Sequence, residues 1–307
     1  MSDRDAEIQS FLTANGWGGS ENSPVAADMS TRKYFRLNRG SETAILMDAE
    51  TSMKSFQNMT LWLAKAGLTV PRILAGRADR GLLLLEDFGE TSVKDALSHS
   101  APLSDEVFGD CVDLLLRIRS AEPPELPNPT ASDLAAWTTL ADEHLPGINK
   151  AALAVFRLRL TEILDGVFKA PVTVSLRDFH SENMMWLPDR KGFKRLGLLD
   201  YQDAFLTHPA YDLMSLLTDA RTWVSKERRL AVLAQYIEKS GDSVDAFELA
   251  FAGLSAQRNL RIMGIFARSG KHMTYLPNTY RYFIEALEHP AFDAVKGDTI
   301  RAIPEPA

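Results

Sequence analysis

The sequence predicts an α+β fold in two lobes, a small β-rich N-terminal lobe over residues 1–88 and a larger helical lobe over residues 89–307. Two observations support this prediction. Before residue 88, short apolar and aromatic runs alternate with turn-forming residues, which is typical of strands. After residue 89, apolar residues recur at helical spacing almost throughout.

The first lobe is predicted to be a five-stranded sheet with one helix, preceded by a helical extension. Residues 6–14 have apolar residues on one helical face, and Asn15-Gly16 supplies a stop signal. Strand-like runs occupy residues 33–37, 44–47, 72–75 and 82–85. The turn at residues 38–40 makes the first two runs a hairpin. Residues 52–67 form the helix, which ends at Gly67.

The second lobe is predicted to start near Ser92, which forms a possible capping box with Asp95 three residues later. Four prolines between residues 123 and 129 interrupt the helices, because proline lacks the backbone donor of a helix interior. The β-like runs 172–176 and 196–199 each adjoin a cluster of polar residues. We therefore expect the chemistry at those two clusters.

The composition excludes several classes of function. Among 307 residues, 45% are hydrophobic and 24% charged, and 34 Lys+Arg against 41 Asp+Glu give a net charge of −7. An acidic protein has no general electrostatic attraction to nucleic acid or anionic membrane, so we expect small-molecule partners. The single cysteine, Cys111, lies in a helical apolar pattern and is predicted to be a core residue. No signal-like or membrane-spanning run is present, and we expect a cytoplasmic protein.

Three polar residues carry the candidate chemistry: Asp178, Asn183 and Asp200. The first two form an Asp-x-x-x-x-Asn pair after one β-like run, and Asp200 ends the next. Phosphoryl transfer needs a carboxylate to orient the attacking hydroxyl, and a second carboxylate with an amide oxygen to hold Mg²⁺. The spacing alone is a weak signal, because Asn and Asp often only form turns. Its position between two apolar runs strengthens it.

Other polar residues leave two interpretations open. Asp203 either contacts metal or substrate or forms a turn. Arg258, Arg261 and Arg268 recur at helical spacing. They form either a basic stripe that binds a carboxylate, or a solvated helix face or structural pairs with acidic residues. His180 and His208 do not predict a zinc site, because no further Cys or His completes a ligand set.

The runs around these residues resemble the aminoglycoside phosphotransferase family, whose fold is protein-kinase-like. The matching segments are residues 176–183 (LRDFHSEN), 199–204 (LDYQDA) and 208–213 (HPAYDL). A narrower resemblance is to the branch that phosphorylates the anomeric hydroxyl of N-acetylmuramate and N-acetylglucosamine. That resemblance rests on residues 32–36 (RKYFR), 45–48 (ILMD) and 200–204 (DYQDA).

The resemblance implies an ATP- and Mg²⁺-dependent kinase of a small-molecule hydroxyl. It implies Asp178 as the catalytic base and Asn183 and Asp200 as metal ligands. Other implied roles are hinge residues that contact adenine (Leu85, Glu86, Asp87) and support of the catalytic loop by Asp212. From their positions in the sequence, we add Arg177 as a support of that loop and Asp203, Arg258 and Arg261 as candidate substrate contacts.

The sequence departs from the family at three points. Leu176 stands where the family has a histidine, residues 44–48 contain no lysine to meet the phosphates, and the helix at 52–67 contains no acidic residue. We predict that Arg32, or alternatively Lys33, supplies the missing cation, since arginine suits a bidentate phosphate contact. The missing lysine also leaves open a nucleotide-binding pseudokinase. Alternative acceptors are an aminoglycoside, choline or homoserine.

Overall fold

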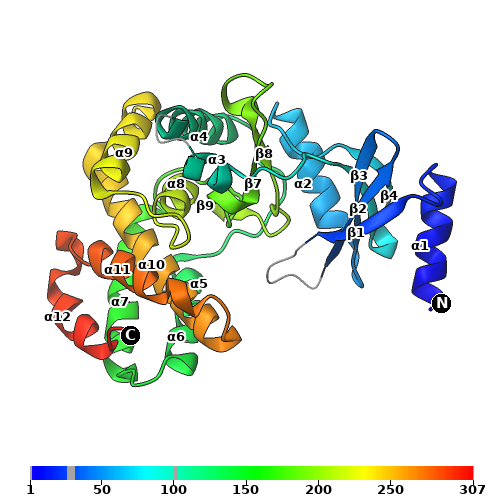
Figure 1. Cartoon of the computed structure of the whole chain (residues 1–307). Helices are drawn as coiled ribbons and strands as arrows, with labels where there is room; N and C mark the ends of the chain where they lie inside the picture. The colour runs from blue at the N-terminus through cyan, green and yellow to red at the C-terminus, as the bar shows by residue number, and fades with distance from the viewer. Residues whose placement is uncertain (1, 26–31, 100–102, 307) are drawn as a thin grey trace. The chain divides into compact units, whose positions relative to one another are not determined.

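A computed structural model of the chain describes residues 2–25, 32–99 and 103–306, and Figure 1 labels its helices and strands. The chain divides into two compact units. The first comprises Met1–Val93 and Met184–Asp203, and the second comprises Lys94–Asn183 and Ala204–Ala307. The lobe boundary at residue 88 stays a prediction, because compactness alone does not define a unit that folds by itself.

The first unit is built on an antiparallel sheet whose described strands follow the order β1-β2-β3-β5-β4. Their bounds are β1 (Glu21–Val25), β2 (Lys33–Arg39), β3 (Glu42–Asp48), β4 (Ile73–Arg77) and β5 (Leu82–Glu86). The predicted hairpin is confirmed as the β2–β3 pair, and Gly40 in its turn has a φ of 61°, which favours glycine. Strand β5 lies between β3 and β4 with Leu82 to Leu85 all buried. An uninterrupted apolar run is typical of such a strand.

Helix α1 (Asp3–Ala14) covers one face of this sheet (Figure 1). It starts at a capping box in which the side chains of Ser2 and Asp5 bond each other's backbone amides. Its residues Phe11 and Leu12 pack with Trp17 against the sheet. The sheet residues of this cluster are Leu37, Ala44, Leu46, Leu82 and Leu84. Alternate residues of a strand lie on the same face of the sheet. Leu82 and Leu84 therefore belong to this cluster, whereas Leu83 and Leu85 are buried on the opposite face.

Helix α2 (Lys54–Lys65) and residues 184–203 complete the first unit. Strand β7 (Met184–Trp186) pairs antiparallel with β8 (Leu196–Leu198). At the centre of β8, a Cβ on Gly197 would lie 2.7 Å from the Phe88 ring. Glycine is therefore required there for the ring to pack on the strand.

The second unit is helical, as predicted, around α10 (Val244–Ser269). Helix α10 packs against α6, α7, α8 and α11, and most of its residues are buried. Strand β6 (Thr173–Ser175) pairs with β9 (Phe205–Thr207). The remaining helices are α3 (Val93–His99), α4 (Leu103–Arg119), α5 (Ala131–Ala136), α6 (Thr139–His144), α7 (Lys150–Val167), α8 (Ala210–Leu217), α9 (Lys226–Ser240), α11 (Leu276–Ala286) and α12 (Asp293–Ala302). Short 3-10 helices occupy Ala78–Arg80, Ser181–Asn183, Gly192–Arg195, Met273–Tyr275 and Pro290–Phe292.

Two further expectations concern burial and membrane spans. Cys111 is fully buried in α4, and burial raises the pKa of its thiol, which confirms its interpretation as a core residue. Within residues 2–25, 32–99 and 103–306, no helix has the length and apolar character needed to cross a membrane.

The crossing of α10 and α6 provides a test of the packing. A Cβ on Gly264 would lie 2.5 Å from the Leu140 carbonyl carbon and 2.6 Å from the Ala141 nitrogen, and backbone atoms cannot yield as a side chain can. We expect Gly264→Ala to lower the free energy of unfolding by about 1–3 kcal/mol, an overpacking cost, in urea denaturation.

Gly166→Ala is the matched control, because Gly166 lies in helix α7 with no atom within 4 Å of an added Cβ. The control should gain up to about 1 kcal/mol from helix propensity. Equal stability of the two variants would contradict the close α6–α10 contact.

Candidate active site

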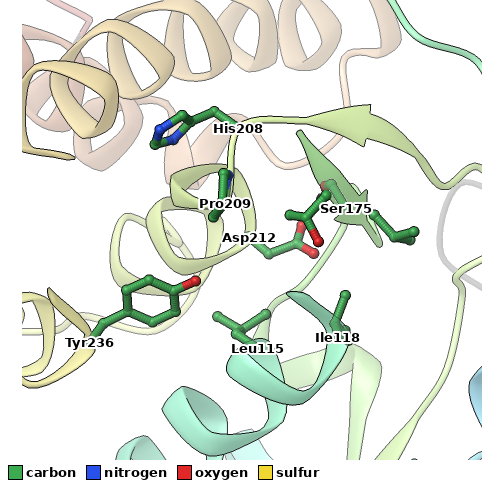
Figure 2. A pocket seen from close by; sticks show the side chains of 9 residues that line it. Leu115, Ile118, Ser175, His208, Pro209, Asp212 and Tyr236 are labelled. Carbon is green, nitrogen blue, oxygen red and sulfur yellow. Dashed lines mark hydrogen bonds between the residues drawn. The ribbon is translucent and has the colours of Figure 1, made fainter. Parts of the chain in front are cut away.

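The loop that carries Asp178 is fixed by one buried carboxylate, that of Asp212 in α8. The Ser175 hydroxyl donates to Asp212 Oδ1 at 2.6 Å, the Leu176 amide donates to Oδ2 at 2.7 Å, and the Arg177 amide donates to Oδ1 at 3.2 Å. Burial raises the pKa of Asp212 to about 6, against the lowering effect of these donors. Figure 2 shows the Asp212 side chain pointing towards Ser175.

The backbone turns sharply between this anchor and Asp178. Arg177 has a φ of 72°, a left-handed conformation that is uncommon for a residue with a side chain. The Asp178 amide donates to the Leu176 carbonyl oxygen at 2.9 Å, which closes the turn. The Leu176 side chain is buried, while that of Asp178 is 44% exposed. The Asp178 carboxylate is thus exposed to solvent while its backbone is held in a fixed conformation.

Asn183 is oriented by the same loop. Its side-chain nitrogen donates to the Asp178 carbonyl oxygen at 3.0 Å and lies 3.2 Å from His180 Nε2. His180 is buried, and burial lowers the pKa of its imidazole well below the ordinary range. The neutral ring can therefore accept from Asn183 through Nε2. Both contacts use the amide nitrogen, which leaves the amide oxygen to face a ligand.

Three arginines gather near Asp178. Arg258 of α10 is 4% exposed, and its Nη2 lies 3.8 Å from Asp178 Oδ1. The guanidinium groups of Arg177 and Arg261 lie over the Trp137 ring, with their carbons 5.8 and 5.2 Å from its centroid. The solvated-face interpretation is wrong for Arg258, whereas Arg268 is exposed and does not join the group.

In the first unit, Asp200 follows β8 with a φ of 56°. The Gln202 side-chain amide donates to Asp200 Oδ1 at 2.8 Å and to Asp203 Oδ2 at 3.3 Å. Arg32 Nη1 lies 3.6 Å from Asp200 Oδ1. Asp200, Asp203 and the predicted cation are therefore neighbours in this unit. Ser30 and Thr31, in the loop before Arg32, lie outside the described residues.

The predicted hinge at Leu85, Glu86 and Asp87 is held by side-chain ion pairs. Arg36 donates two hydrogen bonds to Asp87, from Nε to Oδ2 at 2.7 Å and from Nη2 to Oδ1 at 3.1 Å. Arg72 Nε donates to Glu86 Oε2 at 3.0 Å. Both acidic side chains therefore have partners inside the unit.

The pocket beside Asp212 is not large enough for a substrate. It measures about 10 Å³, room for about one water molecule, and lies between β6, α8 and α4 beside Asp212 (Figure 2). Its lining includes His208, Ser175 and Tyr236. We assign it to the packing beneath the catalytic loop.

Sequence reasoning overlooked several side chains of the candidate site. His180 was considered only as a metal ligand, yet it contacts Asn183. Tyr211, one residue before Asp212, is fully buried, and its hydroxyl has no hydrogen-bond partner among the described residues. Trp137, which carried no sequence-based prediction, lies under two arginines. The HPAYDL segment could have indicated Tyr211, but no local pattern indicates the other two roles.

The buried Asp212 makes a pH-dependent prediction. Its folded pKa, about 6, exceeds its ordinary value of 3.8, so the folded state keeps a proton that the unfolded state releases. Wild-type stability from this group is thus highest below about pH 4 and is lost as pH rises towards about 6. Asp212→Asn removes the titration. We expect wild-type stability minus that of the variant to fall by roughly 2 kcal/mol between pH 4 and 6.5 in urea titrations.

Asp298→Asn, at a carboxylate 75% exposed, controls for the loss of a negative charge. The opposite result would be a difference in stability, wild type minus Asp212→Asn, that rises with pH. It would mean that the hydrogen bonds lower the pKa of Asp212 by more than burial raises it.

Comparisons with known proteins were made for the whole chain. The model of the phosphotransferase enzyme family matches residues 21–247. An N-acetylmuramate/N-acetylglucosamine kinase of Caulobacter vibrioides is 33% identical over an alignment of 359 positions, which covers 99% of this chain and 98% of the relative. A protein of the same name from Pseudomonas aeruginosa is 28% identical over 99% of this chain and 95% of the relative.

Solved structures are similar at lower identity. A choline kinase of Streptococcus pneumoniae matches with a TM-score of 0.65 and 14% identity, over 94% of this chain and 99% of that one. The GDP complex of an aminoglycoside 2'-phosphotransferase matches with a TM-score of 0.64 and 13% identity, over 97% and 99% of the chains. These similarities confirm the predicted α+β, kinase-like fold class.

Proposed function

The chain belongs to the phosphotransferase enzyme family, and on that premise we propose that it transfers the γ-phosphate of ATP to the anomeric hydroxyl of N-acetylmuramate or N-acetylglucosamine. The choice of acceptor rests on one observation: the chain is similar, over 99% of its length, to kinases named for these two sugars. The family match shows that the chain is a small-molecule phosphotransferase. Because ATP is abundant in the cytoplasm, we propose that compartment for the reaction.

Asp178 is the proposed catalytic base. In the reaction, the sugar hydroxyl oxygen bonds to the γ-phosphorus, the bond from that phosphorus to the β,γ-bridging oxygen breaks, and ADP leaves with the electron pair. The hydroxyl proton passes to the Asp178 carboxylate. That carboxylate is exposed on a backbone fixed by Asp212, and Arg258 lies 3.8 Å away. Orientation of the base therefore does not depend on the substrate.

Asn183 and Asp200 are the proposed ligands of Mg²⁺, a hard cation that takes oxygen donors and keeps waters and phosphate oxygens as its other ligands. The donor set fits, since the amide nitrogen of Asn183 is engaged by Asp178 and His180, which leaves an oxygen for the metal. When bound, Mg²⁺ would neutralise the charge of the transferring phosphate. Among the described residues, no three of His, Cys, Asp and Glu form a metal cage.

Arg32 is the proposed phosphate-facing cation in place of the missing strand lysine. It lies 3.6 Å from Asp200, the proposed metal ligand. A guanidinium next to a metal-binding carboxylate is suitably placed to pair with the phosphates that share the metal. Asp203 is proposed as a neighbour that Gln202 links to Asp200.

Asp178→Asn tests the catalytic base. Positioned general-base help is worth about 10²–10⁴ in rate, so kcat for ADP release with either sugar should fall by that factor. Nucleotide affinity, measured by calorimetry with ADP and Mg²⁺, should stay within about twofold. Asp165→Asn, at an exposed carboxylate of α7, is the control and should keep full turnover. Undiminished turnover by Asp178→Asn would remove Asp178 from the mechanism.

Arg32→Ala, compared with Lys33→Ala, tests the cation. Loss of a charged hydrogen bond costs about 1.5–3 kcal/mol, so KM for ATP should rise roughly 10–100-fold in the Arg32 variant. The side chain of the neighbouring Lys33 is exposed on β2, and its variant should change KM by less than about twofold. The reverse result would transfer the role to Lys33.

A further inference from the structure

The arginines near Asp178 carry more positive charge than that carboxylate can balance. Arg258 is paired with Asp178, 3.8 Å away. Arg177 and Arg261 form no ion pair with any carboxylate of the described residues, and both lie over Trp137. Burial, together with repulsion from Arg177 and Arg258, lowers the pKa of the Arg261 guanidinium. Like charges this close are stabilised by an anion between them.

A buried hydroxyl lies at the same place. The Tyr211 side chain is fully buried, its hydroxyl has no hydrogen-bond partner among the described residues, and the charges of Arg261, Arg258 and Asp178 all act on it. Leaving a buried hydroxyl unpaired costs free energy, and an anion held by the neighbouring arginines would give this one an acceptor. A phenol and a guanidinium both donate to an anion.

Resting on the proposed function, we infer that Arg261, with the Tyr211 hydroxyl, binds the carboxylate of an acidic sugar acceptor and so favours N-acetylmuramate over N-acetylglucosamine. Arg258 and Arg261 are three residues apart on α10, which puts their Cβ atoms roughly 5–6 Å apart. A sugar whose reacting hydroxyl meets Asp178, beside Arg258, would extend across its ring towards Arg261. Only N-acetylmuramate has a carboxylate, on its lactyl group, to place there.

Stacking on Trp137 prepares Arg261 for this role. A guanidinium held over an aromatic face loses less freedom when it binds a carboxylate than a mobile side chain does. Helix α10 is buried along most of its length, so the arginine stands on a rigid element.

The experiment compares kcat/KM for N-acetylmuramate and N-acetylglucosamine in wild type, Arg261→Gln and Arg261→Lys. Glutamine keeps much of the stem and a donor but removes the charge. We expect the N-acetylmuramate to N-acetylglucosamine ratio of kcat/KM to fall about 10–100-fold in Arg261→Gln and to be partly restored in Arg261→Lys. Arg268→Gln, at an exposed arginine of the same helix, should leave the ratio unchanged. The methyl ester of N-acetylmuramate should behave in wild type like the neutral sugar.

Tyr211→Phe is a second variant whose fold is not at risk, since it removes only an unpaired hydroxyl. Its ratio should fall by about 2–10-fold. An equal fall for both sugars in Arg261→Gln would make Arg261 structural, and a rise in KM for ATP would mean that the anion is a nucleotide phosphate; either result overturns the inference while the proposed function stands. Turnover of neither sugar by wild type would overturn both.

Discussion

The buried carboxylate of Asp212 is the constraint on which the catalytic loop depends. Two backbone amides and the Ser175 hydroxyl need an acceptor in the buried interior, and one side chain satisfies all three. The bonded amides belong to Leu176 and Arg177, so their hydrogen bonds to Asp212 hold the left-handed turn at Arg177. The direction of the next side chain, Asp178, follows from that turn. Burying the Asp212 carboxylate costs free energy, but the carboxylate fixes the conformation of the loop that carries Asp178.

Two kinds of support serve Asp178 and the arginines around it. The base stands on a loop whose position comes from hydrogen bonds, whereas Arg258 and Arg261 stand on α10, whose position comes from apolar packing against four other helices. Packing tolerates little displacement, because a protein interior is nearly as dense as a crystal. The side chains that α10 places near Asp178 and the loop that carries Asp178 can therefore vary separately in sequence.

The sequence predicted elements whose signal is local and failed where structure depends on distant partners. The hairpin of β2 and β3 and the buried run of β5 follow from alternation, turn residues and continuous leucines. Strand β1 was missed because it is mostly exposed, contains Pro24 and pairs only at the sheet edge. Asp178 and Asn183 were found through their spacing, but the burial of Arg258 and the contact of His180 with Asn183 arise only in three dimensions. Helical spacing suggested the arginine stripe without saying which arginines are buried.

The absence of both members of the usual lysine–glutamate pair is easier to understand from the contacts of the first unit. Helix α2 offers no acid, and it is joined to the Asp200 loop by uncharged groups: Thr60 and Tyr201 share a buried hydrogen bond of 2.8 Å, and Phe56 stacks on the Tyr201 ring. A neutral bond needs no desolvation of two charges, so its removal from water costs less than that of an ion pair. The cation that we propose for the phosphates, Arg32, lies instead beside Asp200. In this proposal Tyr201 links α2 to the Asp200 loop and Arg32 binds phosphate, so loss of the lysine does not by itself indicate loss of catalysis.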